Sequence, residues 1–325
     1  MPDQPAVAPG EPSVSAEPSV AVLVVTWNSA AVLPDFLAAL PEAMAGLDWH
    51  LVVADNDSAD DTVDLLHRLA PDATVVQTGR NAGYAAGVNA ALDAALARDG
   101  GTAAALVCNP DIRMRQGCGG QLFDALGEPL PDGATVGIAV PLIHEEDGRT
   151  LLLSLHREPS VTRALGEAVI GNRRAGRFPR WSETVSDPAA YTAPTPTDWA
   201  SGALMLLSRA CLDACGHWDE SFFLYSEETE YCLRARDLGF ATRLQPRATA
   251  VHLGGDSQVS PRLWTLLVLN RVRLHRKRHG AVSTAAFRAA VLFRESTRAL
   301  LGRPTSRAAA AALLSPTALS RPPGP

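Results

Sequence analysis

The chain of 325 residues is 46% hydrophobic and 20% charged, and its formal net charge is −6. This length allows one large domain with a full hydrophobic core, and no stretch approaches the roughly 18 consecutive apolar residues of a transmembrane helix. The five cysteines lack the paired spacing of a zinc site, which favours buried thiols in a cytosolic protein.

Residues 1–19 are acidic and Pro-rich and contain no apolar core. We therefore expect a disordered leader there and no secretory signal peptide.

Four apolar runs in the first 115 residues predict strands at 20–25, 50–54, 74–77 and 103–107. Continuous apolar runs of this kind are typical of strands buried on both faces of a parallel sheet. Segments with helical periodicity separate the strands, at 30–44, 59–69 and from about 84 to 97. This alternation predicts an α/β fold in which helices cover both faces of an open, mostly parallel sheet.

Polar side chains follow each of these four strands: Asn28, then Asp55 and Asp57, then Arg80 and Asn81, then Asn109 and Asp111. One such loop is ordinary turn chemistry. Because ligands of parallel sheets bind beyond the C-terminal strand ends, four such loops in succession predict a ligand site at this edge.

The second half of the chain is less regular. Strands are predicted at 136–140, 151–155, 198–207, 242–244 and 248–251, and helices at 263–279 and 284–301. Residues 158–196 are rich in Pro, Arg and Ser, and we expect a long mobile loop there, acting as a lid or an acceptor-facing flap.

The segment Asp219–Gly239 begins with aromatic and apolar residues and then places Glu227, Glu228 and Glu230 at the start of a predicted helix. Acidic residues favour a first helical turn, which is the simpler explanation. The apolar run in front indicates instead that the acids are directed out of a core into a cleft, where a carboxylate is a candidate general base.

Two further residues are candidate metal ligands. Asp111 follows a buried strand and a proline, and His252 follows the predicted strand at 248–251. A hard divalent cation that also binds phosphates needs only one or two protein ligands. An Asx turn and a structural histidine are the simpler alternatives.

The C-terminal part is strongly basic. From Pro261 onwards it has 12 Arg and Lys residues and one acid, Glu295, a balance of +11, whereas the first 260 residues carry −17. We expect a basic amphipathic helical tail at 261–302 and disorder at 303–325. Such a tail favours peripheral contact with an anionic membrane, with a solvated helix face as the alternative. No nucleic-acid-binding signature accompanies the charge, so nucleic acid is not an expected partner.

Seven short segments occur in order between Val20 and about Gly280: VLVVTWNS, VVADNDSADDT, GRNAGYAAGVN, LVCNPD, DWASGA, FFLYSEETEYCLRARDLGF and VHLGGDS. Together they resemble glycosyltransferase family 2, the inverting enzymes of the GT-A fold, and in particular its bacterial rhamnosyltransferase-like branch. The resemblance implies a GT-A domain at 20–260, with a nucleotide-binding half at 20–115 and an acceptor half at 116–260.

The resemblance also implies roles for individual residues. Asp55 resembles the carboxylate that contacts the pyrimidine base of the donor, and Glu228 the catalytic base. Asp111 and His252 match the ligands of Mg²⁺ or Mn²⁺. The other donor-binding matches are Thr26, Asn28, Arg80, Asn81, Gly83 and Asn109. The matches around the donor sugar and acceptor are Trp199, Ser201, Gly202 and Glu227.

Three positions depart from the family pattern. Asn109 replaces an Asp that many relatives have, and Glu228 and Glu230 replace shorter acids. A longer base either reaches a deeper acceptor hydroxyl or impairs the enzyme, because catalysis depends on accurate positioning. A degenerate sugar-nucleotide-binding protein is therefore the non-enzymatic alternative.

The expected function is inverting, metal-dependent transfer of a sugar, L-rhamnose from dTDP-rhamnose, to a lipid-linked or cell-envelope glycan. The acceptor would be a polyprenyl diphosphate glycan, and the protein would be cytoplasmic, at the inner face of the membrane. A galactofuranosyl or other hexosyl transferase using a UDP-sugar, or a natural-product glycosyltransferase, is the alternative.

Overall fold

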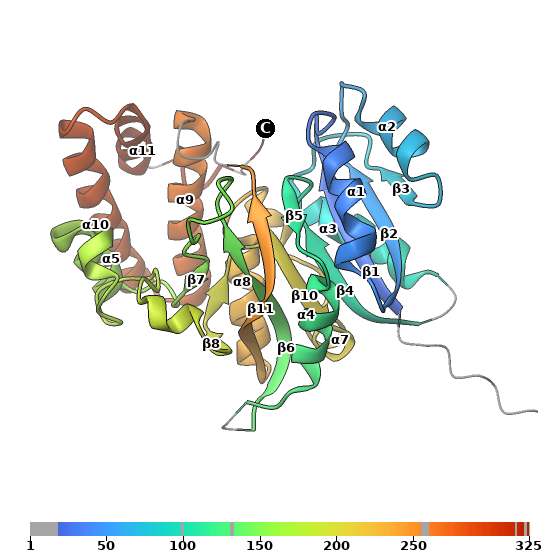
Figure 1. Cartoon of the computed structure of the whole chain (residues 1–325). Coiled ribbons are helices and arrows are strands. Elements are labelled where there is room, and N and C mark those ends of the chain that lie inside the picture. The colour runs from blue at the N-terminus through green and yellow to red at the C-terminus, as the bar shows by residue number, and fades with distance from the viewer. Residues whose placement is uncertain are drawn as a thin grey trace, which may run out of the picture.

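The computed structural model describes residues 19–98, 101–130, 133–254, 260–315, 317–321 and 324. The leader predicted at 1–19 thus lies outside the described residues, apart from Ser19. Within the described ranges the chain folds around one sheet of nine strands with helices on both faces (Figure 1). This confirms the predicted α/β class.

The first half forms the parallel part of the sheet. Its strands are β1 (Ser19–Thr26), β2 (Asp48–Asp55), β3 (Thr74–Gln77) and β4 (Thr102–Cys108), in the order β3-β2-β1-β4. Helices α1 (Leu33–Ala43) and α2 (Thr62–Leu69) cover one face, and α3 (Tyr84–Leu96) covers the other. Val20 to Val24 are at most 1% exposed because both faces are covered. Every strand and helix predicted for this half is present.

The second half continues the same sheet. Strand β10 (Leu204–Ser208) runs antiparallel between β4 and β6 (Thr135–His144), and β11 (Phe240–His252) pairs with β6 in parallel. Strands β5 (Ile112–Met114) and β8 (Thr195–Thr197) both pair with β11. Helix α4 (Cys118–Gly127) covers the face of α1, whereas α7 (Arg209–Cys215) and α8 (Glu227–Asp237) cover the face of α3.

Two strand predictions need correction. The segments predicted as strands at 242–244 and 248–251 form the single strand β11, whose register against β6 shifts between Gln245 and Thr249. The strand predicted at 198–207 is divided by a turn at Gly202 into β9 (Trp199–Ala200) and β10. Strand β9 leaves the large sheet and pairs with β7 (Leu155–His156), the end of the strand predicted at 151–155.

The prediction of a mobile loop at 158–196 was wrong. This segment contains α5 (Val161–Ile170), α6 (Asn172–Ala175), the 3-10 helix η1 (Pro188–Tyr191) and β8. Ser160 caps α5 by accepting from the backbone N–H of Arg163, and the buried Glu167 carboxylate accepts from Ser182 Oγ and Glu183 N. Buried polar contacts hold this segment in place, and such contacts leave no periodic apolar signature in the sequence.

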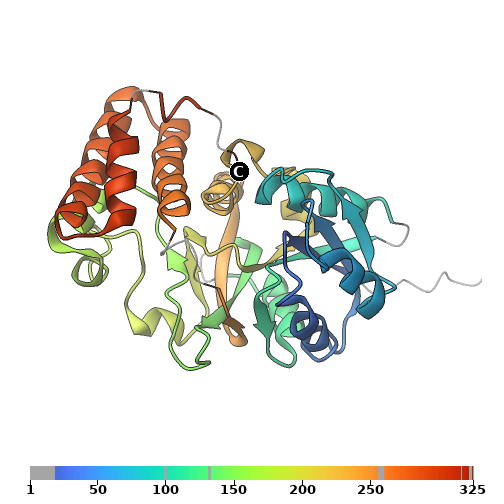
Figure 2. The same cartoon turned by 90° about the horizontal axis from the view of Figure 1, so that it is seen from above.

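Three helices follow the sheet: α9 (Pro261–Arg278), α10 (Ala281–Leu300) and α11 (Pro304–Leu314). The first two confirm predicted helices. Helix α11 corrects the disorder predicted at 303–325, because the Ala-rich run has high helix propensity and buries Ala309 and Leu313 beside α9 and α10. Figure 2 shows these helices and α5 as a layer beside the sheet. Within the described ranges, no helix is both long and apolar enough to cross a membrane.

Three of the basic side chains of α9 form ion pairs with acids that lie earlier in the chain. Arg271 pairs with Glu183 at 2.5 Å, Arg278 with Glu158 at 2.8 Å, and Lys277 with Asp219. Three of the nine Arg and Lys residues of the predicted tail therefore neutralise acids of the preceding domain.

Candidate active site

A cleft of about 670 Å³ lies at the C-terminal ends of the parallel strands. Loops after β1, β2 and β4 and the loop before α3 line it, together with residues 223–224 and the start of α9. Six predicted site residues are among its lining residues: Thr26, Asn28, Asn81, Gly83, Asn109 and Asp111. The edge of the sheet where a ligand site was predicted is therefore hollowed.

Two other predicted site residues, Asp55 and Arg80, lie outside the lining of the cleft. Asp55 is only 2% exposed, and its carboxylate accepts hydrogen bonds from Thr26 Oγ1 at 2.8 Å, Ser58 N at 2.9 Å and Ser58 Oγ at 2.6 Å. It lies behind the lining of the cleft and holds the loops after β1 and β2 together. Arg80 is exposed and also lies outside the lining.

Three of the lining residues that were not predicted have side chains suited to binding a ligand: Trp27, Asn56 and Tyr84. Trp27 is 56% exposed, a large aromatic side chain at a strand end facing the cleft. Asn56 donates from Nδ2 to the carbonyl of Gly83 at 2.9 Å, and Tyr84 begins α3. An exposed tryptophan directly after a buried strand is a sequence signal that could have identified Trp27, since bases stack readily on aromatic rings.

Asp111 and His252 meet at one side of the cleft. The distance from His252 Nε2 to Asp111 Oδ2 is 3.4 Å, and Asp111 Oδ1 is buried without a hydrogen-bond partner among the described residues. A Cβ on Gly254 would lie 2.3 Å from Asp111 Oδ2, so only glycine leaves this space free.

This pair fits a divalent cation that is completed by phosphate oxygens, because such a cation needs few protein ligands. Among the described residues, no three His, Cys, Asp or Glu side chains converge on one point. The protein atoms in these ranges thus supply a carboxylate and an imidazole, and leave the remaining positions to a bound ligand.

Glu228 lies in the first turn of α8, beside the cleft. A Cβ on Gly202 would come within 2.9 Å of Glu228 Cβ, and the Tyr84 hydroxyl donates to the Gly202 carbonyl at 3.3 Å. Burial raises the pKa of Tyr84, and the charges of Cys108, Glu227, Glu228 and Asp111 raise it further. The Tyr84 hydroxyl thus contacts the residue that lies against Glu228, and Tyr84 and Asp111 line the same cleft.

Glu228 itself lines a smaller pocket of about 90 Å³ next to the cleft, shared with Trp199, Glu183 and Arg271. The adjacent residues Leu224 and Tyr225 line the large cleft and the small pocket respectively. The two cavities are thus separated by one short loop.

The electrostatics of the two neighbouring acids favour proton transfer near neutral pH. Burial raises the pKa of Glu228 to about 7. Burial and then the charge of Glu228 raise the pKa of Glu227 well above its usual value, and Glu227 is only 2% exposed. Glu230 differs because it pairs with Arg234 at 2.8 Å. A carboxyl group with a pKa near 7 is well matched to general-base work at physiological pH.

One side of the small pocket is built on β9. Trp199 donates from Nε1 to the carbonyl of Arg157 at 3.0 Å and stacks on His156, with 4.1 Å between ring centroids. Ser201 N donates to the carbonyl of Ser154 at 3.0 Å. Trp199 thus lines the same pocket as Glu228, and Gly202 lies against the Glu228 side chain. The hydrogen bond of Ser201 holds the turn between Trp199 and Gly202.

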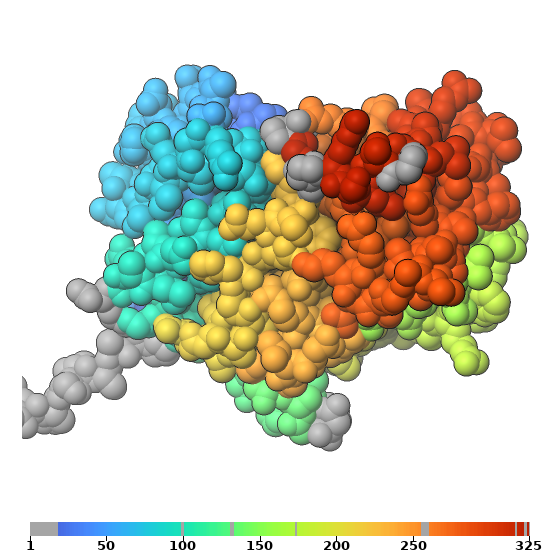
Figure 3. Space-filling model, turned by 180° about the vertical axis from the view of Figure 1, so that it is seen from behind, coloured from blue at the N-terminus to red at the C-terminus, as the bar shows by residue number. Residues whose placement is uncertain are grey.

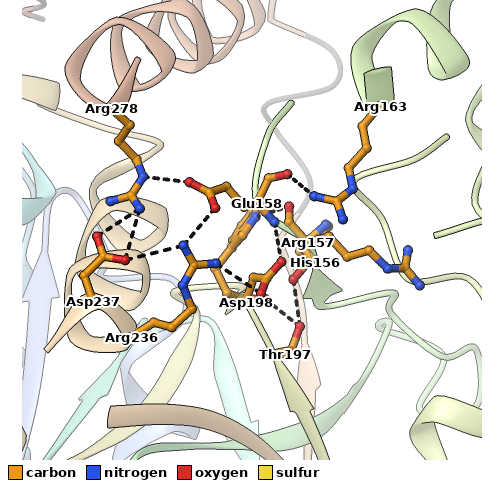
Figure 4. Close-up of polar contacts among 10 residues, drawn as sticks. His156, Arg157, Glu158, Arg163, Thr197, Asp198, Arg236, Asp237 and Arg278 are labelled. Carbon is orange, nitrogen blue, oxygen red and sulfur yellow. Dashed lines mark hydrogen bonds and ion pairs between the residues drawn. The ribbon is translucent and has the colours of Figure 1, made fainter. Parts of the chain in front are cut away.

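An ionic network joins the C-terminal end of α8 to the residue before β9, to Glu158 and to α9 (Figure 4). Arg236 pairs with Glu158 at 2.8 Å and with Asp198 at 3.2 Å. Arg278 of α9 pairs with Glu158 at 2.8 Å and with Asp237 at 2.9 Å. Helix α8, β9 and α9 are therefore linked by one set of charges.

Comparison with known proteins identifies the enzyme class. Residues 21–172 match the sequence model of glycosyl transferase family 2. The chain is a glycosyltransferase with a family 2 domain. Over 240 residues it is 29% identical to the N-acetylglucosaminyl-diphospho-decaprenol L-rhamnosyltransferase of Mycobacterium tuberculosis, a match that covers 71% of this chain and 75% of that protein.

Other relatives agree with this class and with the fold. A low-salt glycan biosynthesis hexosyltransferase of Haloferax volcanii is 26% identical over 185 residues, or 57% of this chain and 52% of its own. The mannosyltransferase of Pyrobaculum calidifontis, solved with GDP-Man and Mn²⁺, has a TM-score of 0.53 at 19% identity and covers 95% of this chain and 81% of its own. The GT-A fold predicted for this glycosyltransferase is therefore confirmed.

Proposed function

We propose that this glycosyltransferase moves a sugar from a nucleoside diphosphate to a hydroxyl group with inversion, and that Glu228 is the general base. The observation that supports this most strongly is the arrangement around Tyr84. Its hydroxyl donates to the carbonyl of Gly202 beside Glu228, and Tyr84 lines the same cleft as Asp111.

In the proposed reaction, Glu228 accepts the proton of the acceptor hydroxyl as that oxygen attacks the anomeric carbon. The bond between the anomeric carbon and the diphosphate oxygen breaks on the opposite face, and the diphosphate leaves with the electron pair. Asp111 and His252 would hold Mg²⁺ or Mn²⁺, which when bound stabilises negative charge on the departing diphosphate. The unpartnered Asp111 Oδ1 supports this assignment.

For the substrates we propose dTDP-L-rhamnose and a polyprenyl-diphosphate-linked glycan. The name of the mycobacterial relative, which specifies L-rhamnose and an N-acetylglucosaminyl-diphospho lipid, supports both. The exposed Trp27 in the cleft offers a face on which a pyrimidine base can stack. A UDP-hexose donor is the second candidate, favoured by the Haloferax hexosyltransferase.

Transfer tests this assignment directly. Purified protein with Mn²⁺, dTDP-L-rhamnose and a short-chain polyprenyl-diphospho-N-acetylglucosamine should give a disaccharide lipid, detected by mass spectrometry. Glu228→Gln should lower the rate by about 10²- to 10⁴-fold with unchanged donor binding, whereas the exposed Glu146→Gln should match the parent. Full activity of Glu228→Gln would remove this residue from the mechanism, and transfer from a UDP-hexose alone would reassign the donor.

A lipid-linked acceptor implies contact with a membrane surface. The sequence assigned this contact to the basic tail at 261–302, but three of the six Arg and Lys residues of α9, Arg271, Lys277 and Arg278, are paired with acids of the preceding domain. The exposed apolar and basic side chains of α5, of residues 174–181 and of the end of α10 are better suited. We call this set the apolar–arginine face, and it comprises Leu165, Val169, Ile170, Arg174, Arg177, Phe178, Arg180, Trp181, Arg298, Leu300, Leu301 and Arg303.

This face combines exposed apolar side chains with positive charge. Val169 is 72% exposed and Leu301 is 81% exposed, and both line one shallow hollow with Arg298 and Arg303. Between Glu167 and Glu183 the sequence has four arginines and no acid. Arginines around apolar side chains are complementary to anionic headgroups above an acyl layer, so we propose an anionic bilayer as the partner.

A further inference from the structure

The loop that leads into α8 has an unusual backbone. Phe223, Tyr225 and Ser226 have positive φ angles of 63°, 68° and 76°, although none of them is glycine. Phe223 is the centre of a three-residue turn closed by a hydrogen bond from Leu224 N to Phe222 O at 2.8 Å. Left-handed non-glycine residues cost on the order of 1–3 kcal/mol each and persist only where the surroundings hold them.

Asn270 of α9 holds this loop. Its Nδ2 donates to three main-chain carbonyls, those of Phe222 at 2.8 Å, Leu224 at 2.8 Å and Tyr225 at 3.0 Å. Asn270 is completely buried, and its Oδ1 accepts from Arg273 Nη1 at 2.6 Å. The side-chain amide is therefore oriented by Arg273 and directed at the carbonyls that the left-handed turns expose.

The opposite side of the loop is held by the donor-binding half. Tyr84 N donates to the carbonyl of Phe223, and a Cβ on Gly83 would come within 2.4 Å of that same oxygen. Figure 3 shows the segment that carries α7 and α8, in yellow, between the first half of the chain and the C-terminal helices. The loop thus has contacts to the donor cleft on one side and to α9 on the other.

We propose that Asn270 is a positioning residue for the catalytic base: it holds the left-handed loop 222–226 in the shape that directs Glu228 toward the acceptor pocket. This rests on the proposed role of Glu228. Loss of the amide donor would leave three carbonyls without their partner and allow the loop to relax. Because Glu227 and Glu228 follow the loop directly, a small relaxation displaces the base.

Two substitutions at this position separate hydrogen bonding from packing. Asn270→Ala removes the donor and leaves a cavity. Asn270→Asp keeps the size of the side chain and an acceptor for Arg273, but presents an oxygen to three carbonyls. Both should lower kcat by about 10- to 100-fold, because misplacing a catalytic group by about 1 Å has effects of this size. Donor affinity, measured by titration with dTDP, should fall much less than kcat, because only Phe223 and Leu224 of the loop line the cleft.

Asn89→Ala is the matched control. Asn89 is also buried. It bonds the N–H and the carbonyl of Trp218 at 2.8 and 3.0 Å, and its Nδ2 also donates to Glu220 Oε1 at 2.9 Å, so among the described residues its hydrogen bonds hold the segment before the loop and none reaches residues 222–226. Its loss should lower the melting temperature to a similar degree and leave kcat close to that of the parent. A kcat loss in Asn89→Ala equal to that in both Asn270 variants would overturn the proposal, as would unchanged kcat in all three.

A second readout does not depend on turnover. Amide hydrogen exchange over 222–230 should become faster in Asn270→Ala and Asn270→Asp but not in Asn89→Ala, and unchanged exchange in the Asn270 variants would overturn the proposal. The acid limb of the kcat profile should also move to lower pH, because a displaced Glu228 is better solvated while Glu227, Glu183 and Arg271 still face it. If the parent transfers no sugar from any donor, the proposed function fails, and exchange alone decides the role of Asn270.

Discussion

At the scale of single residues, Gly202 makes room for the side chain of Glu228, the proposed base. A Cβ on Gly202 would lie 2.9 Å from Glu228 Cβ and 3.3 Å from Cγ, whereas the more distant Cδ would be 4.0 Å away. The family resemblance places a shorter acid at position 228, but that acid also has a Cβ and a Cγ. An acidic side chain of either length in this position therefore needs glycine at position 202.

The raised pKa of Glu228 predicts how activity depends on pH. Because the base must be ionised and its pKa is about 7, kcat should rise with pH up to about 7 and then level off. A rate–pH profile with dTDP-L-rhamnose checks this. A profile already level at pH 5 would show that another group titrates, or that Glu228 is not the base.

The same shift predicts the effect of Glu228→Gln on stability. The folded pKa of about 7 exceeds the usual value of 4.5, so the folded state binds more protons in this window and the protein loses stability as pH rises through it. Because glutamine does not titrate, the variant Glu228→Gln lacks this pH-dependent loss of stability. The melting temperature of Glu228→Gln relative to the parent should therefore increase between about pH 4.5 and pH 7, which differential scanning calorimetry measures.

At the scale of elements, α8 is held at both ends by segments distant in sequence. Its first turn follows the loop bound by Asn270, and its last turn carries Arg236 and Asp237 in the ionic network with Glu158 and Arg278. Fixing both ends of a helix restricts its sliding and rotation. Helix α8 can therefore present Glu228 in one orientation to the cleft.

The ionic network predicts an acid-dependent contribution to stability. Although burial opposes ionisation, hydrogen bonds from Arg236 and Arg278 hold the pKa of Glu158 below its usual value. Its contribution is thus present above the unfolded pKa and lost as pH falls through the folded one. After screening by solvent, Glu158→Gln should cost about 1 kcal/mol at pH 7, or about 2 °C in melting temperature, and much less at pH 3.

A matched substitution controls for charge removal alone. Asp213→Asn breaks the pair with Arg209, whose side chains are 57% and 46% exposed, and should leave the melting temperature close to that of the parent. A loss for Glu158→Gln that is the same at pH 3 and pH 7 would contradict an ionic origin.

At the scale of the whole molecule, the first half of the sheet, helix α8 and the C-terminal helices lie beside one another in that order (Figure 2). The apolar–arginine face lies on the layer farthest from the donor-binding half. A membrane at this face would lie on the acceptor side of the enzyme, while the donor cleft stays open to soluble nucleotide sugar.

Liposome binding tests this face. The protein should co-sediment with vesicles containing phosphatidylglycerol and much less with vesicles of phosphatidylcholine alone. The double variant Val169→Ser/Leu301→Ser and the triple variant Arg174→Gln/Arg177→Gln/Arg180→Gln should each weaken binding, with transfer to a water-soluble acceptor unchanged.

Arg209→Gln, on the opposite side of the acceptor half, is the control. Equal binding to both vesicle types would reject the proposal, as would concentration-dependent dimerisation abolished by the double variant without any lipid binding.

The first half of the fold was predictable because its strands are buried on both faces. An apolar run such as Val20 to Val25 has few other stable environments, and the polar residues after each strand necessarily meet at one edge. The site was predictable to the same extent: Asp111 and His252 each follow a strand, and β5 pairs with β11 so that Ile112 lies opposite His252. By contrast, α11 and α5 were not predicted. The only sequence signal for α11 is a short Ala-rich run, and α5 is held by buried polar contacts.

The α/β class, the polar edge of the sheet and the residue types Glu228, Asp111 and His252 can thus be read from the amino-acid order, since they follow from local hydrophobic patterns and residue type. The placement of Asp55 behind the cleft, the ion pairs of Arg271, Lys277 and Arg278, and the hydrogen bond of Asn270 to a carbonyl 48 positions away became apparent in the folded chain. Such contacts depend on how distant segments pack, and packing across long sequence separations leaves no local pattern to read.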